Sequence, residues 1–195
     1  ADGALLITPY YNKPTQEGLY RHYTAVAEAV DLPLILYNIP GRTGVNMLPS
    51  TIDRLSAMKT IIGVKEGSGS VQQASDIVQM CGDRLTVLAG DASLTLPMMA
   101  VGGKGVITVT ANIVPAEMAA LVKAFADGAV AEARRIHFKL SPLFAALFFE
   151  TNPIPVKEAL GMMGKIDPEL RLPLCPMAQD TREKLVQALK DAKLI

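Results

Sequence analysis

Residues 61–66 read Ile61-Ile62-Gly63-Val64-Lys65-Glu66, a short apolar run that ends on two charged residues. A run of about five residues is too short for a typical helix. Near-continuous Val, Ile and Leu are typical of strands buried in a parallel sheet. Four other runs share this character: Ala4–Thr8, Leu34–Asn38, Leu85–Gly90 and Val106–Thr110. The five runs predict five parallel strands.

The segments between these runs carry apolar residues at helical spacing. The first such segment follows Thr15, a residue type that caps helices, and the others are centred on 71–81 and 115–125. After the fifth run the alternation stops, and three helical patterns remain, at about Ala129–Phe149, Pro155–Met163 and Gln179–Ala192. Alternation of strand and helix predicts an α/β protein with a parallel sheet.

Two α/β architectures fit this order, an open doubly wound sheet and a (β/α)₈ TIM barrel. No Gly-rich dinucleotide fingerprint follows any strand, which favours the barrel. A complete barrel needs typically ~250 residues, so this chain would supply strands 4–8. We therefore expect residues 1–127 to form the last five βα units and residues 128–195 a C-terminal helical extension. Because the chain opens on a strand-like run without Met, we expect it to be a fragment that lacks three units.

Composition narrows the class of protein. The 195 residues include 19 basic and 19 acidic side chains, so no net charge favours nucleic acid or a membrane surface as a partner. No apolar run approaches the roughly 20 residues of a membrane span. The two cysteines have no metal or redox spacing, and no His, Cys, Asp and Glu cluster predicts a metal site. We expect a cytoplasmic protein with no metal site.

Lys65 is the one lysine that ends an apolar strand run. Burial lowers the pKa of a lysine toward the neutral amine, and the neutral amine forms imines with carbonyl substrates. The alternative is a lysine that extends to solvent or pairs with an acid such as Glu66. In a barrel, reactive groups lie at the carboxyl ends of strands, which is where Lys65 stands.

Other strand ends carry groups that suit imine chemistry. Tyr37 ends a neighbouring run and Tyr11 follows another, and phenols can transfer protons during imine formation. Arg42 follows Tyr37 and can hold a carboxylate through two hydrogen bonds. Packing roles for the tyrosines and a solvated loop position for the arginine remain alternatives. Gly90 permits close backbone approach, and a carbonyl near Ile107 can face a bound keto acid.

The strand-end motifs resemble, in order, those of the dihydrodipicolinate synthase family, within the superfamily of pyruvate-dependent aldolases and N-acetylneuraminate lyases. The matching stretches are Thr8-Pro9-Tyr10-Tyr11-Asn12-Lys13-Pro14, Tyr37-Asn38-Ile39-Pro40-Gly41-Arg42-Thr43-Gly44, Gly63-Val64-Lys65-Glu66, Gly105–Asn112 and Asn152–Lys157. The resemblance runs through essentially the whole chain. It implies the C-terminal two thirds of a (β/α)₈ barrel.

The resemblance also implies a function, the condensation of pyruvate with L-aspartate 4-semialdehyde to 4-hydroxy-tetrahydrodipicolinate in lysine and diaminopimelate biosynthesis. It implies catalytic roles for Lys65, as the Schiff-base lysine, and for Tyr37 and Tyr11 as proton-transfer groups. Arg42 would bind the second substrate, and Ile107 and Gly90 would line the pyruvate pocket. Tyr10 would lie at a subunit interface near an effector site of a homotetramer.

Two departures from the family leave alternatives open. The family has roughly a hundred residues before the position at which this chain starts, including a Thr-Thr pair of the proton relay. A catalytically incomplete fragment is therefore one alternative. Glu66-Gly67-Ser68-Gly69 stands where many members have Glu-Ala-Thr-Gly, a change that leaves the reactive groups in place. The other alternative is a different pyruvate-dependent aldolase or 2-keto acid dehydratase of the superfamily, although Arg42 favours the synthase.

Overall fold

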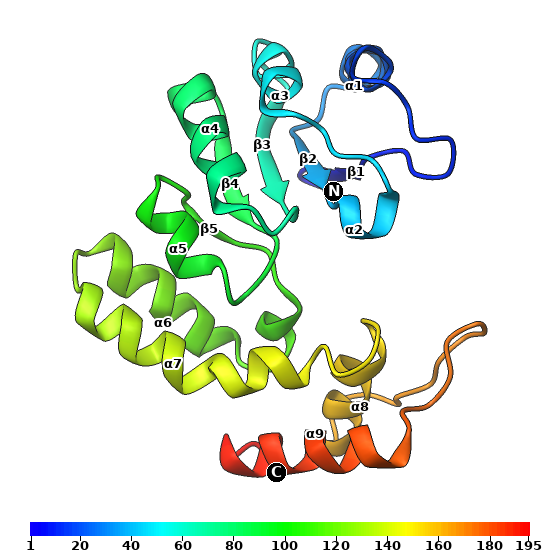
Figure 1. Cartoon of the computed structure of the whole chain (residues 1–195), viewed down its shortest axis with the longest axis vertical. Helices are drawn as coiled ribbons and strands as arrows, with labels where there is room; N and C mark the ends of the chain where they lie inside the picture. The colour runs from blue at the N-terminus through cyan, green and yellow to red at the C-terminus, as the bar shows by residue number, and fades with distance from the viewer. The chain divides into compact units, whose positions relative to one another are not determined.

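The computed structural model describes residues 1–195. The chain divides into two compact units, Ala1–Ile107 and Thr108–Ile195 (Figure 1). The first unit holds all the strands and the second is helical. Helix α6 (Pro115–Ala126), which follows the last strand, belongs to the second unit. The division predicted at residue 127 was drawn from the strand and helix alternation, and it stays a prediction.

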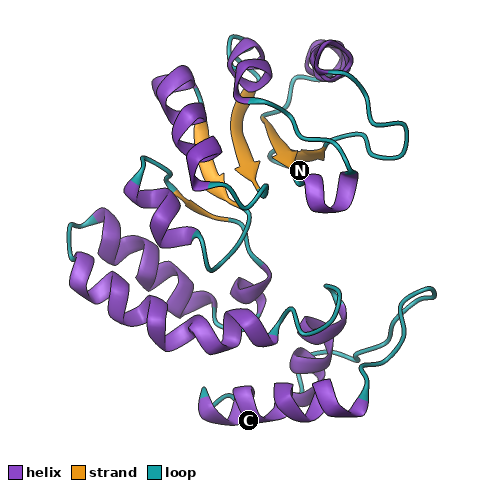
Figure 2. Cartoon of the chain, viewed as in Figure 1, coloured by secondary structure: helices purple, strands orange, loops and turns teal.

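The first unit is built on one parallel sheet with strands in the order in which they occur along the chain (Figure 2). The strands are β1 (Ala4–Ile7), β2 (Leu34–Asn38), β3 (Ile61–Glu66), β4 (Thr86–Ala89) and β5 (Gly105–Val106). Because each connection runs in the same direction across the sheet and crossovers are right-handed, the helices fall on one face. A doubly wound sheet reverses its strand order instead. The consecutive order is that of a barrel segment.

Helices of the first unit begin where the sequence offers caps. In α1 (Gln16–Ala29) the Thr15 hydroxyl accepts a hydrogen bond from the Gly18 N–H, and Ser70 does the same for the Gln73 N–H in α4 (Val71–Cys81). Three short helices were not predicted: α2 (Pro40–Thr43), α3 (Pro49–Leu55) and α5 (Thr95–Ala100). Both α2 and α3 start at a proline, whose fixed φ suits a first turn.

The two faces of the sheet differ in burial. Side chains toward the helices, such as Leu34, Leu36 and Val64, are at most 1% exposed and form the core with α1, α3 and α4. On the opposite face Leu5 and Ile7 are each 44% exposed and Ile62 is 46% exposed. These side chains lie on the face that the helices of this chain leave uncovered, which in a barrel is the inner face.

The fifth predicted strand is wrong in extent. Residues 106–110 were expected to be extended, but β5 ends at Val106 and a 3₁₀ helix occupies Val109–Asn112. The Thr108 hydroxyl accepts a hydrogen bond from the Thr110 N–H and so caps this turn. A Thr residue suits a strand and a cap equally well, and here the local hydrogen bond determines the structure.

The second unit consists of α6, α7 (Val130–Ala146), α8 (Ile154–Met162) and α9 (Gln179–Asp191). Helix α7 packs along α6 and against α9. Its buried apolar stripe comprises Ala133, Ile136, Leu140, Leu143 and Phe144. The three C-terminal helices match the predicted positions, except that α7 ends at Ala146 and not at Phe149. No helix of the chain combines the length and the apolar character that a membrane span requires.

Candidate active site

Tyr37 and Lys65 lie side by side at the carboxyl ends of neighbouring strands. They are register partners in the β2–β3 ladder, so both side chains extend from the same face of the sheet. The Lys65 Nζ atom lies 4.0 Å from the centroid of the Tyr37 ring. The structure thus brings together the two residues that the sequence predicts as nucleophile and proton-transfer group.

A β-bulge creates this pairing. Leu34 pairs with Ile61, but the next residue, Ile35, pairs with Gly63, so Ile62 is left over. Without the shift, Tyr37 would face Val64 and Lys65 would face Asn38. Bulges are common near active sites because one extra residue redirects the side chains that follow. Here it places an amine beside a phenol.

Burial lowers the pKa of Lys65 below the usual value for lysine. The face of the Tyr37 ring opposes this effect, since an aromatic ring attracts an ammonium group. Desolvation is the larger influence, because it removes water from the charged form. The half-buried Lys65 is therefore more often a neutral amine, and hence more nucleophilic, than a solvated lysine at the same pH.

Burial also raises the pKa of Tyr37, and the positive charge of Arg42 partly opposes the rise. The phenol therefore keeps its proton near neutral pH and can donate it. Arg42 is exposed on α2, in the segment that directly follows β2. The structure places the arginine close enough to act on Tyr37 electrostatically, as expected for a group at the rim of one site.

Gly90 and Ile107 stand at the carboxyl ends of β4 and β5. The Gly90 N–H donates to the Glu66 carbonyl at 2.7 Å, and the Ile107 N–H donates to the Ala89 carbonyl at 3.0 Å. A methyl group added to Gly90 would lie 2.9 Å from the Gly67 Cα atom, so no side chain fits there. Both residues border the strand ends near Lys65, and their roles in pyruvate binding stay predictions.

Tyr10 and Tyr11 are not part of this cluster. Tyr11 is 91% exposed and Tyr10 is 63% exposed, in the turn closed by the hydrogen bond from the Lys13 N–H to the Tyr10 carbonyl. No hydrogen bond or ring contact joins either residue to Lys65 or Tyr37. Their predicted roles, proton relay for Tyr11 and interface or effector site for Tyr10, therefore stay predictions.

Sequence reasoning missed a polar cluster on the helix-covered face, directly behind Tyr37 and Lys65. Glu66 is 2% exposed and Asn38 is fully buried, and they are register partners in the sheet. The Asn38 side-chain amide donates to the Glu66 carboxylate at 3.0 Å, as does that of Gln73. The alternation of side chains along a strand could have predicted this cluster, because it places Asn38 on the same face as the buried Leu34 and Leu36.

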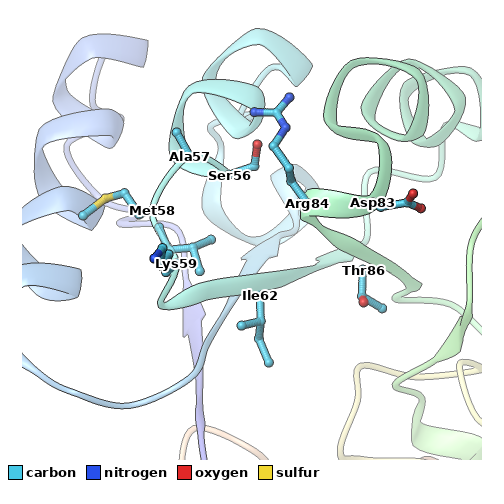
Figure 3. A pocket seen from close by; sticks show the side chains of 9 residues that line it. Ser56, Ala57, Met58, Lys59, Ile62, Asp83, Arg84 and Thr86 are labelled. Carbon is cyan, nitrogen blue, oxygen red and sulfur yellow. The ribbon is translucent and has the colours of Figure 1, made fainter.

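A cavity of about 450 Å³ in the first unit lies at the opposite ends of the strands. It is lined by Ser56 and Met58, by Lys59, and by Arg84 and neighbouring residues. Figure 3 shows Ile62 and Thr86 extending from the strands in the direction opposite to Arg84. Arg84 is bound to Asp53 at 2.5 Å and to the Met80 carbonyl. None of the predicted site residues lines this cavity.

No group of three or more His, Cys, Asp or Glu side chains is arranged to hold a metal ion. The candidate site consists of the Lys65 amine, the Tyr37 phenol, the Arg42 guanidinium and backbone amides. The amine can attack a carbonyl group, the phenol can transfer a proton, and the guanidinium can bind an anionic substrate.

Comparison with known proteins identifies the family of this chain. Residues 1–192 match the model of the dihydrodipicolinate synthetase family. This chain belongs to that family. A 4-hydroxy-tetrahydrodipicolinate synthase from Geotalea daltonii is 60% identical over 195 residues, which are 100% of this chain and 67% of the relative.

Solved structures of the family superpose closely on the chain. The dihydrodipicolinate synthase of Aquifex aeolicus has a TM-score of 0.98 at 48% identity, and covers 100% of this chain with 67% of its own. The chloride-inhibited enzyme of Acinetobacter baumannii, crystallised in complex with pyruvate, has a TM-score of 0.97 at 48% identity over the same shares. The predicted fold is confirmed: the chain is a partial (β/α)₈ barrel and spans about two thirds of the length of these relatives.

Proposed function

We propose that this chain carries the pyruvate-activating part of a 4-hydroxy-tetrahydrodipicolinate synthase. The reaction is the condensation of pyruvate with L-aspartate 4-semialdehyde, through a Schiff base on Lys65. The observation that carries the proposal is the amine of Lys65, with a pKa lowered by burial, against the Tyr37 ring at the carboxyl ends of β3 and β2. The names of the relatives support the choice of substrates.

The first half of the mechanism forms the nucleophile. The neutral amine of Lys65 attacks C2 of pyruvate, and the ketone oxygen takes up a proton from the Tyr37 phenol to give a carbinolamine. Loss of that oxygen as water leaves a protonated imine. The imine draws electrons from the neighbouring methyl group, which loses a proton to the Tyr37 phenolate left by the first step and becomes the terminal carbon of an enamine.

The second half forms the product. The enamine carbon attacks the aldehyde of L-aspartate 4-semialdehyde, and a carbon–carbon bond replaces the aldehyde π bond. The new alkoxide takes a proton from the Tyr37 phenol, and Arg42 binds the carboxylate of this substrate. The substrate's amino group then adds to the imine carbon, and Lys65 leaves as the amine while the ring closes. All steps use protein side chains, which is why we propose no metal and no organic cofactor.

Reductive trapping tests the proposal. Borohydride reduces an imine to a stable secondary amine, so wild-type protein incubated with pyruvate and borohydride should gain one reduced pyruvate per chain, on the peptide that contains Lys65. Intact-mass spectrometry and peptide mapping read the result. Borohydride without pyruvate and the variant Lys65→Met are the controls. A wild-type chain that gains no pyruvate contradicts the proposed function.

Turnover separates the synthase from related lyases. A synthase discharges the pyruvate enamine onto L-aspartate 4-semialdehyde, so adding this aldehyde should lower the trapped yield and release the ring product. Unchanged trapping in the presence of the aldehyde would favour another pyruvate-dependent aldolase or 2-keto acid dehydratase. Trapping without release of product would instead indicate a catalytically incomplete fragment.

The proposal extends to the oligomeric state of the protein and to its location in the cell. The exposure of Tyr10 and Tyr11 supports a subunit interface over this turn, and hence the homotetramer that the family resemblance implies. A biosynthetic reaction of two small metabolites supports a cytoplasmic location. Sedimentation and cell fractionation measure the two properties.

A further inference from the structure

Five polar side chains form a hydrogen-bonded cluster behind the Tyr37–Lys65 pair, here named the Glu66 cluster: Gln16, Asn38, Asn46, Glu66 and Gln73. Asn38 and Glu66 are buried, and the other three are half-buried. At its centre the Glu66 carboxylate accepts hydrogen bonds from the side-chain amides of Asn38 and Gln73, each at 3.0 Å. Its other oxygen accepts from the Ser68 N–H at 2.6 Å. The mechanism proposed above gives this carboxylate no part in the chemistry.

Burying a carboxylate is costly, even when amide donors satisfy its oxygens. An apolar side chain at this position would pack against the core without that cost. The three donors come from β2, from α4 and from the turn after β3, so the carboxylate joins three separate segments. Burial of the Glu66 carboxylate thus costs free energy, but it connects three segments of the chain. Such a group is suited to holding those segments in place relative to one another.

The cluster also closes the base of the segment that carries Arg42. The Asn38 amide nitrogen donates to the Asn46 side-chain oxygen at 2.8 Å, and the Asn38 oxygen accepts from the Met47 N–H at 3.0 Å. Residues 39–45 therefore form a loop whose two ends are fastened by one side chain. Arg42 lies at the middle of this loop, which we name the Arg42 loop.

Main-chain hydrogen bonds of Asn38 and Glu66, which a side-chain substitution leaves in place, fix the strand end that carries the nucleophile. Glu66 follows Lys65 directly, the Gly67 N–H donates to the Asn38 carbonyl at 2.8 Å, and the Gly90 N–H donates to the Glu66 carbonyl at 2.7 Å. Asn38 is thus bound through its side chain to both the Arg42 loop and Glu66. One short chain of hydrogen bonds connects the position of Arg42 with the position of Lys65.

We propose that Glu66 is a positioning residue that holds the Arg42 loop in place relative to Lys65, and thereby sets the affinity for the carboxylate of the aldehyde substrate. The substrate part of this statement rests on the proposed function. The hydrogen-bonding part does not. Glu66 acts through Asn38 and Arg42 and does not touch the reacting atoms.

Glu66→Gln tests the positioning role with little change in shape. One carboxylate oxygen becomes an NH₂ group and faces donors, which breaks the bond to Ser68 or the bonds to Asn38 and Gln73. Amide hydrogen exchange in the peptide that spans 39–47 should become about tenfold faster. A purely stabilising role would instead raise exchange equally in all peptides of the first unit, including 61–66 and 86–89.

Two further variants keep the test decisive. Gln73→Met removes the side-chain amide that donates to Glu66 and to Asn46 and accepts from Asn46, and it should also raise exchange in 39–47 if Glu66→Gln does not fold. Ser56→Ala is the matched control, because it removes a buried hydroxyl that donates to the Asp53 carbonyl, before β3 begins. It should leave exchange in 39–47 unchanged.

Kinetics supply the second readout. Glu66→Gln should raise KM for L-aspartate 4-semialdehyde about tenfold, whereas trapping of pyruvate on Lys65 should proceed at the wild-type rate. Unchanged exchange in 39–47 in the folded variants, or an unchanged KM, overturns the positioning role. If wild-type protein traps no pyruvate, the proposed function fails, and the exchange data alone still decide whether Glu66 holds the Arg42 loop.

Discussion

A lysine lies near each end of β3, and the two differ in burial and in contact with a tyrosine ring. Lys65, at the carboxyl end, is half-buried, lies 4.0 Å from a tyrosine ring and has a pKa lowered by burial. Lys59, two residues before the strand begins, is exposed and lines the cavity of about 450 Å³. The cavity thus lies at the end of the strand opposite to Lys65. Burial and strand direction are the grounds on which we propose Lys65 as the nucleophile.

The pair of lysines gives the largest expected contrast. Lys65→Met removes the only amine that the mechanism uses, so borohydride trapping of pyruvate should fall by about a thousandfold or more. Lys59→Met should trap pyruvate like wild type, because a solvated lysine contributes nothing to the imine. Intact-mass spectrometry measures both variants. Equal losses in the two, or retained trapping in Lys65→Met, would contradict the assignment of the nucleophile.

Tyr37→Phe should have the next largest effect. It keeps the ring that contacts the Lys65 ammonium and removes the phenol, so the pyruvate adduct should form about a hundredfold more slowly. Rapid-quench trapping with borohydride measures the rate. Tyr20→Phe is the matched control, since the Tyr20 ring faces Arg54 on the helix side of the first unit. A wild-type rate in Tyr37→Phe would exclude the phenol as a proton donor.

Two arginines extend the comparison. Arg42→Met should leave pyruvate trapping intact and raise KM for L-aspartate 4-semialdehyde by about tenfold to a hundredfold, because a charged hydrogen-bond donor to the carboxylate is lost. Arg84→Met at the other end removes an exposed ion pair with Asp53 and should change KM little. Steady-state kinetics on both variants measure the contrast. A raised KM in both would show a general loss of structure.

Sequence patterns predicted the strands at 34–38 and 61–66 to the residue, because each is an uninterrupted apolar run between turn signals. They also selected Lys65 and Tyr37 as candidates. They could not place the two side by side, since that depends on the bulge at Ile62 and register is a property of two strands together. The same limit hid the Glu66 cluster, whose members come from five segments and meet only in the folded sheet.

The smallest expected effect is on the pH dependence of Lys65. Burial lowers the pKa of Lys65, so at any pH below the ordinary lysine range a larger fraction of Lys65 than of a free lysine side chain is the neutral amine. As pH falls, the reactivity of Lys65 toward an acylating reagent should therefore decline later than that of a lysine in a short unstructured peptide added as an internal standard. Competitive acetylation at a series of pH values, read by peptide mass spectrometry, measures both amines in one sample. Access to the reagent affects the rates but not the pH at which each rate reaches half its maximum, so that midpoint is the quantity to compare. A Lys65 midpoint at or above that of the peptide would show that contact with the Tyr37 ring outweighs desolvation, and the neutral nucleophile would then need another cause.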